Sequence, residues 1–162
     1  MLRDKLRRKL KGLLKDLRLS PVILLPQISF LPSFYIPLPL LKIIHVRWPN
    51  EEHLYHEVGH YHLDTYYGTA IDPKEFMDIF GNKDSWYFGK WWFSRKALDA
   101  VREHKDYPSA YARVHPKEDY AESFILAMSE VSSGCHKYYG SRTLNRKVRM
   151  VKSWIKKSQS AD

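Results

Sequence analysis

Cysteine is nearly absent from this chain of 162 residues: Cys135 is the only one. An internal disulfide bond is therefore excluded, and so is a zinc site built from several cysteines. Long uninterrupted apolar stretches are missing as well, because five prolines interrupt residues 19–41. A cleaved secretory signal and a membrane-spanning helix both need such a stretch, so we expect neither. These absences favour a reducing compartment, and we expect the protein in the cytoplasm.

Acidic residues are scarce at both ends of the chain. Residues 1–18 and 142–162 each carry a net charge of +6, whereas residues 19–141 carry −3. The overall net charge of +9 therefore does not indicate a nucleic-acid-binding centre, which would place basic residues around the working surface. The segments 1–18 and 142–157 are instead suited to contact an acidic partner, a nucleic acid or a membrane surface.

Hydrophobic residues make up 44% of the chain, which is enough for the core of a single domain. Leucines at helical spacing predict a basic amphipathic helix over residues 2–17. The prolines of residues 21–40 predict an extended segment without regular central strands, and β-branched residues predict a strand over 42–48. Periodicity and end signals predict further helices, at residues 51–67, 73–79, 94–104, 118–131 and 144–156.

The helix predicted over residues 51–67 contains the motif H-E-V-G-H at residues 56–60. Residues four apart lie on one helix face, so the imidazoles of His56 and His60 can reach a single metal ion. Zinc accepts neutral imidazole nitrogens and keeps an open position for water in catalytic sites. Glu57 would take a proton from the attacking water as general base. The motif predicts a zinc-dependent peptidase, and the plainer interpretation is a helix with a histidine-rich polar face.

Two histidines do not complete a catalytic zinc site, so a third ligand must come from elsewhere. The metzincin pattern would place glycine at 63 and histidine at 66, but these positions hold Leu63 and Tyr66, which excludes that class. Asp64 and Asp72 are conceivable ligands. Asp64 lies on the same helix as the histidines, however, and a ligand from that helix would crowd the site.

A better candidate for the third ligand lies in the helix predicted over residues 118–131. Glu118 and Glu122 are four residues apart and share one face of this helix. One carboxylate can bind the metal, while the other can accept the outer N–H of a ligand histidine. From the residues alone the assignment between the two stays open, and a solvated helix face would explain the same pair.

The motif at 56–60, together with residues 109–124 (S-A-Y-A-R-V-H-P-K-E-D-Y-A-E-S-F), resembles the metallopeptidase domain of the anthrax-lethal-factor-like and Pro-Pro-endopeptidase group, which includes many short bacterial and phage-encoded proteins. The resemblance covers residues 42–131 and implies an endopeptidase with one catalytic zinc ion and a gluzincin-type third ligand. Residues 1–41 would then form a basic helix and a proline-rich extended segment, and residues 132–162 a basic C-terminal helix.

The resemblance also assigns roles by position. It makes Glu118 the third zinc ligand beside His56 and His60, and it makes Glu122 the partner of a ligand histidine. Tyr111, seven residues before the third ligand, would donate its hydroxyl to the oxyanion of the transition state. A phenol is a suitable donor there, because the tetrahedral intermediate needs a donor in addition to zinc.

For the fold, the resemblance implies a small α+β zincin-like domain, in which a short sheet packs on the active-site helix and a helical C-terminal part follows. A substrate strand would pair with the edge strand of this sheet, which by resemblance is residues 42–48. The chain departs from the family pattern at Asp119, where an aromatic residue is usual. The aromatic residues of 84–93 are expected mostly in the core, with the lining of a substrate cleft as the alternative.

A binding module with a degenerate or structural metal site is the competing prediction. Its basic ends would dock it on a nucleic acid or a membrane, and it would have little or no peptidase activity. The presence of both Glu57 and Tyr111 favours the enzyme, because a protein that no longer needs the chemistry is expected to lose one of them.

Overall fold

The computed structural model describes residues 2–24, 34–37, 42–45, 50–81, 105–109, 111–134, 137 and 139–160. In this part of the chain the elements are α1 (Leu2–Asp16), β1 (Ile23–Leu24), β2 (Phe34–Pro37), β3 (Lys42–His45), α2 (Glu51–Tyr66), α3 (Pro73–Phe80), the 3-10 helix η2 (Tyr111–Val114), α5 (Pro116–Ser133) and α6 (Arg142–Ser160). The protein is a small α+β domain, as predicted. The helix predicted at 94–104 and the aromatic residues 84–93 lie outside the described residues.

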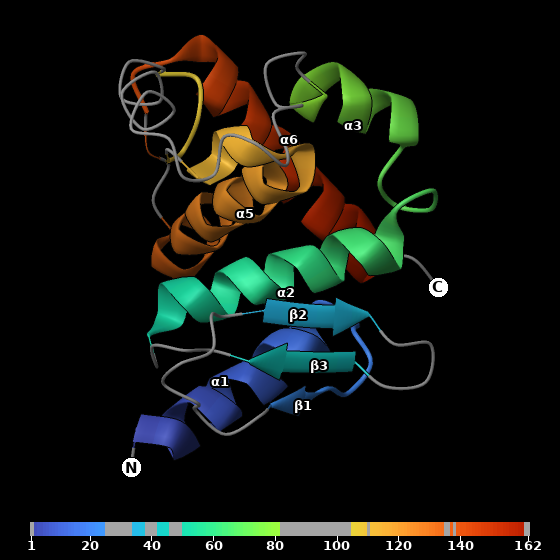
Figure 1. Cartoon of the computed structure of the whole chain (residues 1–162), viewed down its shortest axis with the longest axis vertical. Coiled ribbons are helices and arrows are strands. Elements are labelled where there is room, and N and C mark those ends of the chain that lie inside the picture. The colour runs from blue at the N-terminus through green and yellow to red at the C-terminus, as the bar shows by residue number, and fades with distance from the viewer. Residues whose placement is uncertain are drawn as a thin grey trace.

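Helix α2 occupies the middle of the domain (Figure 1). The three-stranded sheet and α1 lie on one side of it, and α3, α5 and α6 lie on the other. One buried cluster joins these layers, from Leu17 after α1 through Leu54 of α2 to Trp154 of α6. The three predicted segments of the chain therefore share one core, and their boundaries at residues 41 and 131 stay predictions.

The sheet has the strand order β1-β3-β2. Strand β2 pairs antiparallel with β3, with Ile36 opposite Ile43, and β1 pairs parallel with the other side of β3. The prolines of residues 21–40 thus permit two short strands, because both are outer strands and Pro37 stands at the end of one. The prediction that residues 42–48 form the edge strand is wrong: within the described residues 42–45, both sides of the strand are already paired.

Helix α1 confirms the predicted amphipathic pattern. Leu6, Leu10, Leu13 and Leu14 are buried in the core, and most of the helix's basic residues are exposed. Lys9 forms an ion pair with Glu51 in the first turn of α2, and Lys5 lies 3.8 Å from the same carboxylate. The apolar face of α1 is therefore occupied by the core. Among the helices in the described part of the chain, none combines the length and apolar character needed to cross a membrane.

The two helices that carry the predicted site begin at side-chain caps. At the start of α2, the Asn50 side chain accepts a hydrogen bond from the backbone N–H of His53 at 2.8 Å. At the start of α5, Nδ1 of His115 accepts from the backbone N–H of Lys117 at 3.1 Å, and Pro116 suits the first helical position. This cap explains why α5 begins two residues earlier than predicted.

Candidate metal centre

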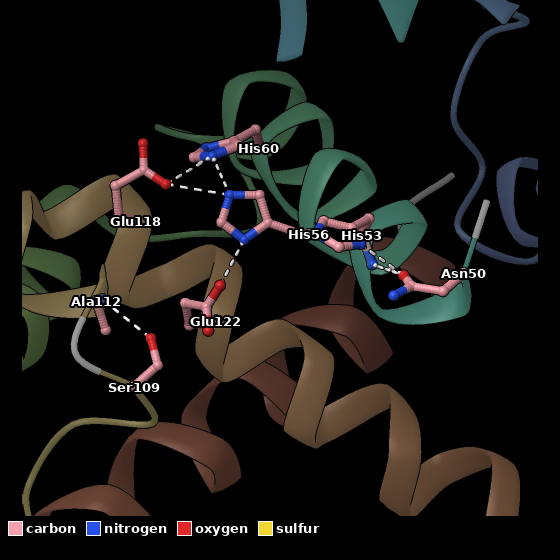
Figure 2. A network of polar contacts seen from close by, with 8 residues as sticks. All are labelled: Asn50, His53, His56, His60, Ser109, Ala112, Glu118 and Glu122. Carbon is pink, nitrogen blue, oxygen red and sulfur yellow. Dashed lines mark hydrogen bonds and ion pairs between the residues drawn. The ribbon is translucent and has the colours of Figure 1, made fainter. Parts of the chain in front are cut away.

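Helices α2 and α5 pack against each other over the middle of the domain. Their closest approach includes Gly59, which faces Ala121 and Phe124. Because Gly59 lies between the two motif histidines in the chain, this contact brings their imidazoles within reach of carboxylates on α5 (Figure 2). The site thus depends on packing between helices that are more than fifty residues apart in sequence.

Three atoms from the two helices form a compact triangle (Figure 2). Nε2 of His56, Nε2 of His60 and Oε2 of Glu118 each lie 3.1 Å from the other two atoms. The three side chains are between 13 and 17% exposed, so the cluster is largely enclosed but open to solvent. These residues are the ones in the described part of the chain that could together hold a metal ion.

The donor set fits a zinc ion. Ligand atoms about 2.0–2.1 Å from a tetrahedral zinc ion lie about 3.4 Å from one another, close to the observed spacing. Oε1 of Glu122 lies 2.8 Å from Nδ1 of His56, so this nitrogen carries a proton, and loss of the proton on Nε2 leaves a lone pair that can bind a metal ion. That lone pair faces the imidazole of His60 and the carboxylate of Glu118. Electron-rich atoms this close together repel one another unless they share a cation.

The other acidic candidates lie elsewhere. Oδ1 of Asp64 is 3.2 Å from Nζ of Lys117, and it does not join the cluster. Oδ1 of Asp72 accepts a hydrogen bond from the backbone N–H of Glu75 at 2.8 Å and so caps α3. Glu122 contacts the outer nitrogen of His56 rather than the triangle. The two glutamates of α5 therefore differ in place: Glu118 contributes an oxygen atom to the triangle, and Glu122 contacts the outer nitrogen of His56.

Neighbouring groups in the cluster strongly shift one another's pKa values. Burial disfavours the charged form of His56, but hydrogen bonds to Glu118 and Glu122 and the charge of Glu57 outweigh it and raise the pKa of His56 to about 10. Burial likewise opposes ionisation of Glu118, but hydrogen bonds from the two histidines lower the pKa of this carboxyl to about 2. A metal ion must displace the proton that the imidazole would otherwise hold, so acid weakens metal binding.

Glu57 lies buried beside the cluster, with 3% of its surface exposed. Burial raises the pKa of its carboxyl to about 8, with His56 lowering the pKa and Glu118 raising it. A divalent cation nearby would favour the carboxylate form, because positive charge stabilises it. A carboxyl group with a pKa in this range can accept or release a proton near neutral pH.

Tyr111 stands at the start of η2, on the side of His56. The centroids of the two rings are 5.8 Å apart, and Tyr111 is 39% exposed. Burial and the negative charges of Glu118 and Glu57 raise the pKa of its hydroxyl far above the usual range. The phenol therefore stays protonated and can serve as a hydrogen-bond donor at the mouth of the site.

Two buried polar contacts could not be predicted from the sequence. Nδ1 of His62 lies 2.8 Å from the hydroxyl of Tyr120, and Nε2 lies 3.0 Å from Oγ of Ser158, so the imidazole joins α2, α5 and α6. The carboxylate of Asp119 lies 2.6 Å from Nζ of Lys147, and both side chains are almost fully buried. The only sequence signal of the second contact is Asp119 itself, a charged residue where the lethal-factor-like pattern used in the sequence comparison has an aromatic one.

Comparison with known families identifies the region that contains this site. A family model described as "Putative zinc-binding metallo-peptidase" matches residues 52–155, well over half of the chain. The matched region runs from the first turn of α2 into α6 and includes the triangle, Glu57, η2 and all of α5. Searches among curated proteins and among solved structures find no match.

Proposed function

Because the chain belongs to this family of zinc-binding metallopeptidases, we propose that it is a zinc-dependent endopeptidase with a zincin-like fold. The observation that carries the proposal is the 3.1 Å triangle formed by Nε2 of His56, Nε2 of His60 and Oε2 of Glu118. A buried glutamate beside such a triangle can supply the general base that metal-assisted hydrolysis of a peptide bond uses.

One zinc ion would be held by the two imidazoles and by Glu118, a gluzincin-type set. Bound there, zinc would supply Lewis acidity that activates water and polarises the scissile carbonyl group. Glu122 fixes the tautomer of His56 and the orientation of its ring, because its carboxylate accepts the Nδ1 proton. The partial exposure of the cluster leaves it accessible to water.

The chain's own groups then handle protons and charge. The carboxylate of Glu57 accepts a proton from the attacking water and delivers it to the departing amine. The hydroxyl of Tyr111 donates a hydrogen bond to the carbonyl oxygen as negative charge develops on it. Its exposure at the site and its protonated state suit this role.

Residues 109–124 lead us to place the protein in the anthrax-lethal-factor-like and Pro-Pro-endopeptidase group, of bacterial or phage origin. The substrate would pair as an added strand with the sheet. Since β3 is internal, the strand that we propose for this pairing is β2, an outer strand that also contacts α2.

A second function is favoured by the exposed basic faces of α1 and α6. Leu6, Leu10, Leu13 and Leu14 of α1 are buried in the core, so contact of this helix with a nucleic acid, a membrane or an acidic protein would be electrostatic rather than by insertion. The basic residues exposed on the two helices are Lys5, Arg7, Arg8, Lys11, Lys15, Arg142, Arg146, Arg149, Lys156 and Lys157. Retention on immobilised DNA that falls steeply with salt would support this function, and retention that is indifferent to salt would contradict it.

The peptidase is tested by measuring zinc content after exhaustive dialysis and cleavage of a peptide library, for the wild-type protein and for Glu57→Gln. We expect one zinc ion per chain in both proteins and cleavage by the wild type alone, because the substitution removes the base but no ligand. A folded wild-type protein without zinc would refute the proposal.

A further inference from the structure

The ammonium group of Lys147 on α6 is enclosed by groups from two other segments. Its Nζ lies 2.6 Å from Oδ2 of Asp119, donates to the backbone carbonyl of Asp106 at 3.0 Å, and lies 3.9 Å from the ring centroid of Tyr107. The lysine side chain is only 3% exposed. A single buried cation therefore ties α5 and the segment 105–109 together.

Both tied segments lead directly to the candidate site. Asp119 follows Glu118 in the first turn of α5. Asp106 lies five residues before Tyr111, the first residue of η2, and η2 packs against α5. We call residues 105–109 together with η2 the tyrosine arm. Lys147 thus connects the tyrosine arm to the helical turn that carries the proposed third ligand.

We propose that Lys147 is a positioning residue for the peptidase: its ammonium group holds the tyrosine arm against the first turn of α5 and so sets where the Tyr111 hydroxyl lies. This inference rests on the proposed function. The tyrosine arm has no strand or helix before η2 among its described residues, so its course depends on such contacts.

The chemistry of the contact supports a role in geometry rather than in stability. A buried ion pair such as Asp119 with Lys147 is often no more stabilising than an apolar pair of similar volume. An apolar side chain in place of Lys147, however, could not bind the carbonyl oxygen of Asp106. Lys147 therefore places a buried cation next to the candidate site, and this cation binds the tyrosine arm through the carbonyl oxygen of Asp106.

The test uses a paired substitution, Asp119→Leu with Lys147→Met. It removes the hydrogen bond to the carbonyl oxygen of Asp106 and replaces the ion pair by an apolar pair. The same helices offer a matched control. Nζ of Lys152 lies 2.9 Å from Oε2 of Glu130, farther along α5, and the glutamate side chain is 4% exposed. Glu130→Leu with Lys152→Met removes this second, partly buried ion pair without touching the tyrosine arm.

The first measurement is hydrogen–deuterium exchange of the metal-free and zinc-loaded full-length proteins, which needs no substrate. We expect amides of residues 105–109 and 111–114 to exchange about tenfold faster in the Lys147 pair variant and at the wild-type rate in the Lys152 control, with α2 protected in both. Exchange in these residues that is equal in the two variants would overturn the inference.

The second measurement is a kinetic cycle with Tyr111→Phe on a peptide that the wild type cleaves. The Lys147 pair variant should lower kcat with KM and zinc content unchanged, and it should have little further effect once Tyr111 is phenylalanine. Independent, multiplicative losses would show that Lys147 does not act through Tyr111. A wild type that cleaves nothing contradicts the proposed function instead, while the exchange comparison still decides whether Lys147 holds the arm.

Discussion

A Cβ atom on Gly59 would lie 3.1 Å from the Cα atom of Ala121, so the glycine sets how closely α2 and α5 approach. The same Cβ would lie 3.1 Å from Cβ of Phe124, whose side chain is fully buried and cannot move aside freely. This approach brings the carboxylates of α5 to the histidines of α2. The fourth position of the H-E-x-G-H motif is therefore a packing requirement of the site.

Gly59→Ala is expected to push α5 away by a few tenths of an ångström and to weaken zinc binding about tenfold. Overpacking costs about 1–3 kcal/mol, which the better helix propensity of alanine offsets by about 1 kcal/mol. Gly12 on α1 is the matched control, since nothing lies within 4 Å of a Cβ there. Gly12→Ala should stabilise the protein and leave zinc affinity unchanged. If both variants behave alike in chelator competition and urea unfolding, the close approach does not constrain the site.

Glu118 and Glu122 should differ sharply when each is changed to glutamine. Glu118 contributes an atom of the triangle, whereas Glu122 reaches only Nδ1 of His56. Loss of an outer partner of this kind typically lowers metal affinity about 10–100-fold, and loss of a ligand should lower it further. Zinc dissociation constants from competition with a fluorescent chelator measure both effects. A larger loss of zinc affinity for the Glu122 variant would mean that Glu122 is the metal ligand and Glu118 is the outer partner.

Tyr111→Phe should lower kcat about 10²–10³-fold while zinc content and KM change little, because a single oxyanion donor contributes about that much to the rate. Tyr67, an exposed tyrosine that follows α2, is the control, and Tyr67→Phe should cleave at the wild-type rate. Steady-state kinetics on one cleaved peptide compares kcat of the two variants. An unchanged kcat in the first variant would remove Tyr111 from the mechanism.

His62 should make the protein sensitive to acid. Burial lowers the pKa of its imidazole to about 3 in the folded protein, while the unfolded chain has a value near 6.5. The unfolded state then binds the extra proton between these values, so folding free energy is lost as pH falls below about 6.5. Between pH 6.5 and pH 5 this single group accounts for about 2 kcal/mol.

The variant His62→Gln removes this proton uptake while keeping polar atoms near Tyr120 and Ser158. Urea unfolding of both proteins with a chelator present, at pH 7 and at pH 5, isolates the contribution because the other titrating groups are shared. The wild type should lose about 2 kcal/mol more than the variant on acidification. Equal losses would mean that His62 takes up a proton in the folded protein.

Local spacing in the sequence was sufficient for the helices in the described part of the chain and for the faces on which the candidate site residues lie. The leucines of residues 2–17 predicted a helix and the face that it buries, and the four-residue spacing of His56 and His60 placed both imidazoles on one face of α2. These relationships lie within one helix, where the geometry of a single turn determines which side chains are neighbours. For the same reason the sequence predicted that Glu118 and Glu122 share a face.

Tertiary packing decided which segments that are distant in sequence come into contact, and local spacing carries no information on this. The sheet places residues 42–45 between two outer strands, because strand order depends on contacts between distant segments and not on the pattern within one strand. Which glutamate of α5 meets the imidazoles depends on how α2 and α5 pack at Gly59. The partner of Asp119 is Lys147, 28 residues later, and only the docking of α6 reveals it. The sequence by itself determined the chemical groups and their local faces, and the packing of helices determined which faces meet.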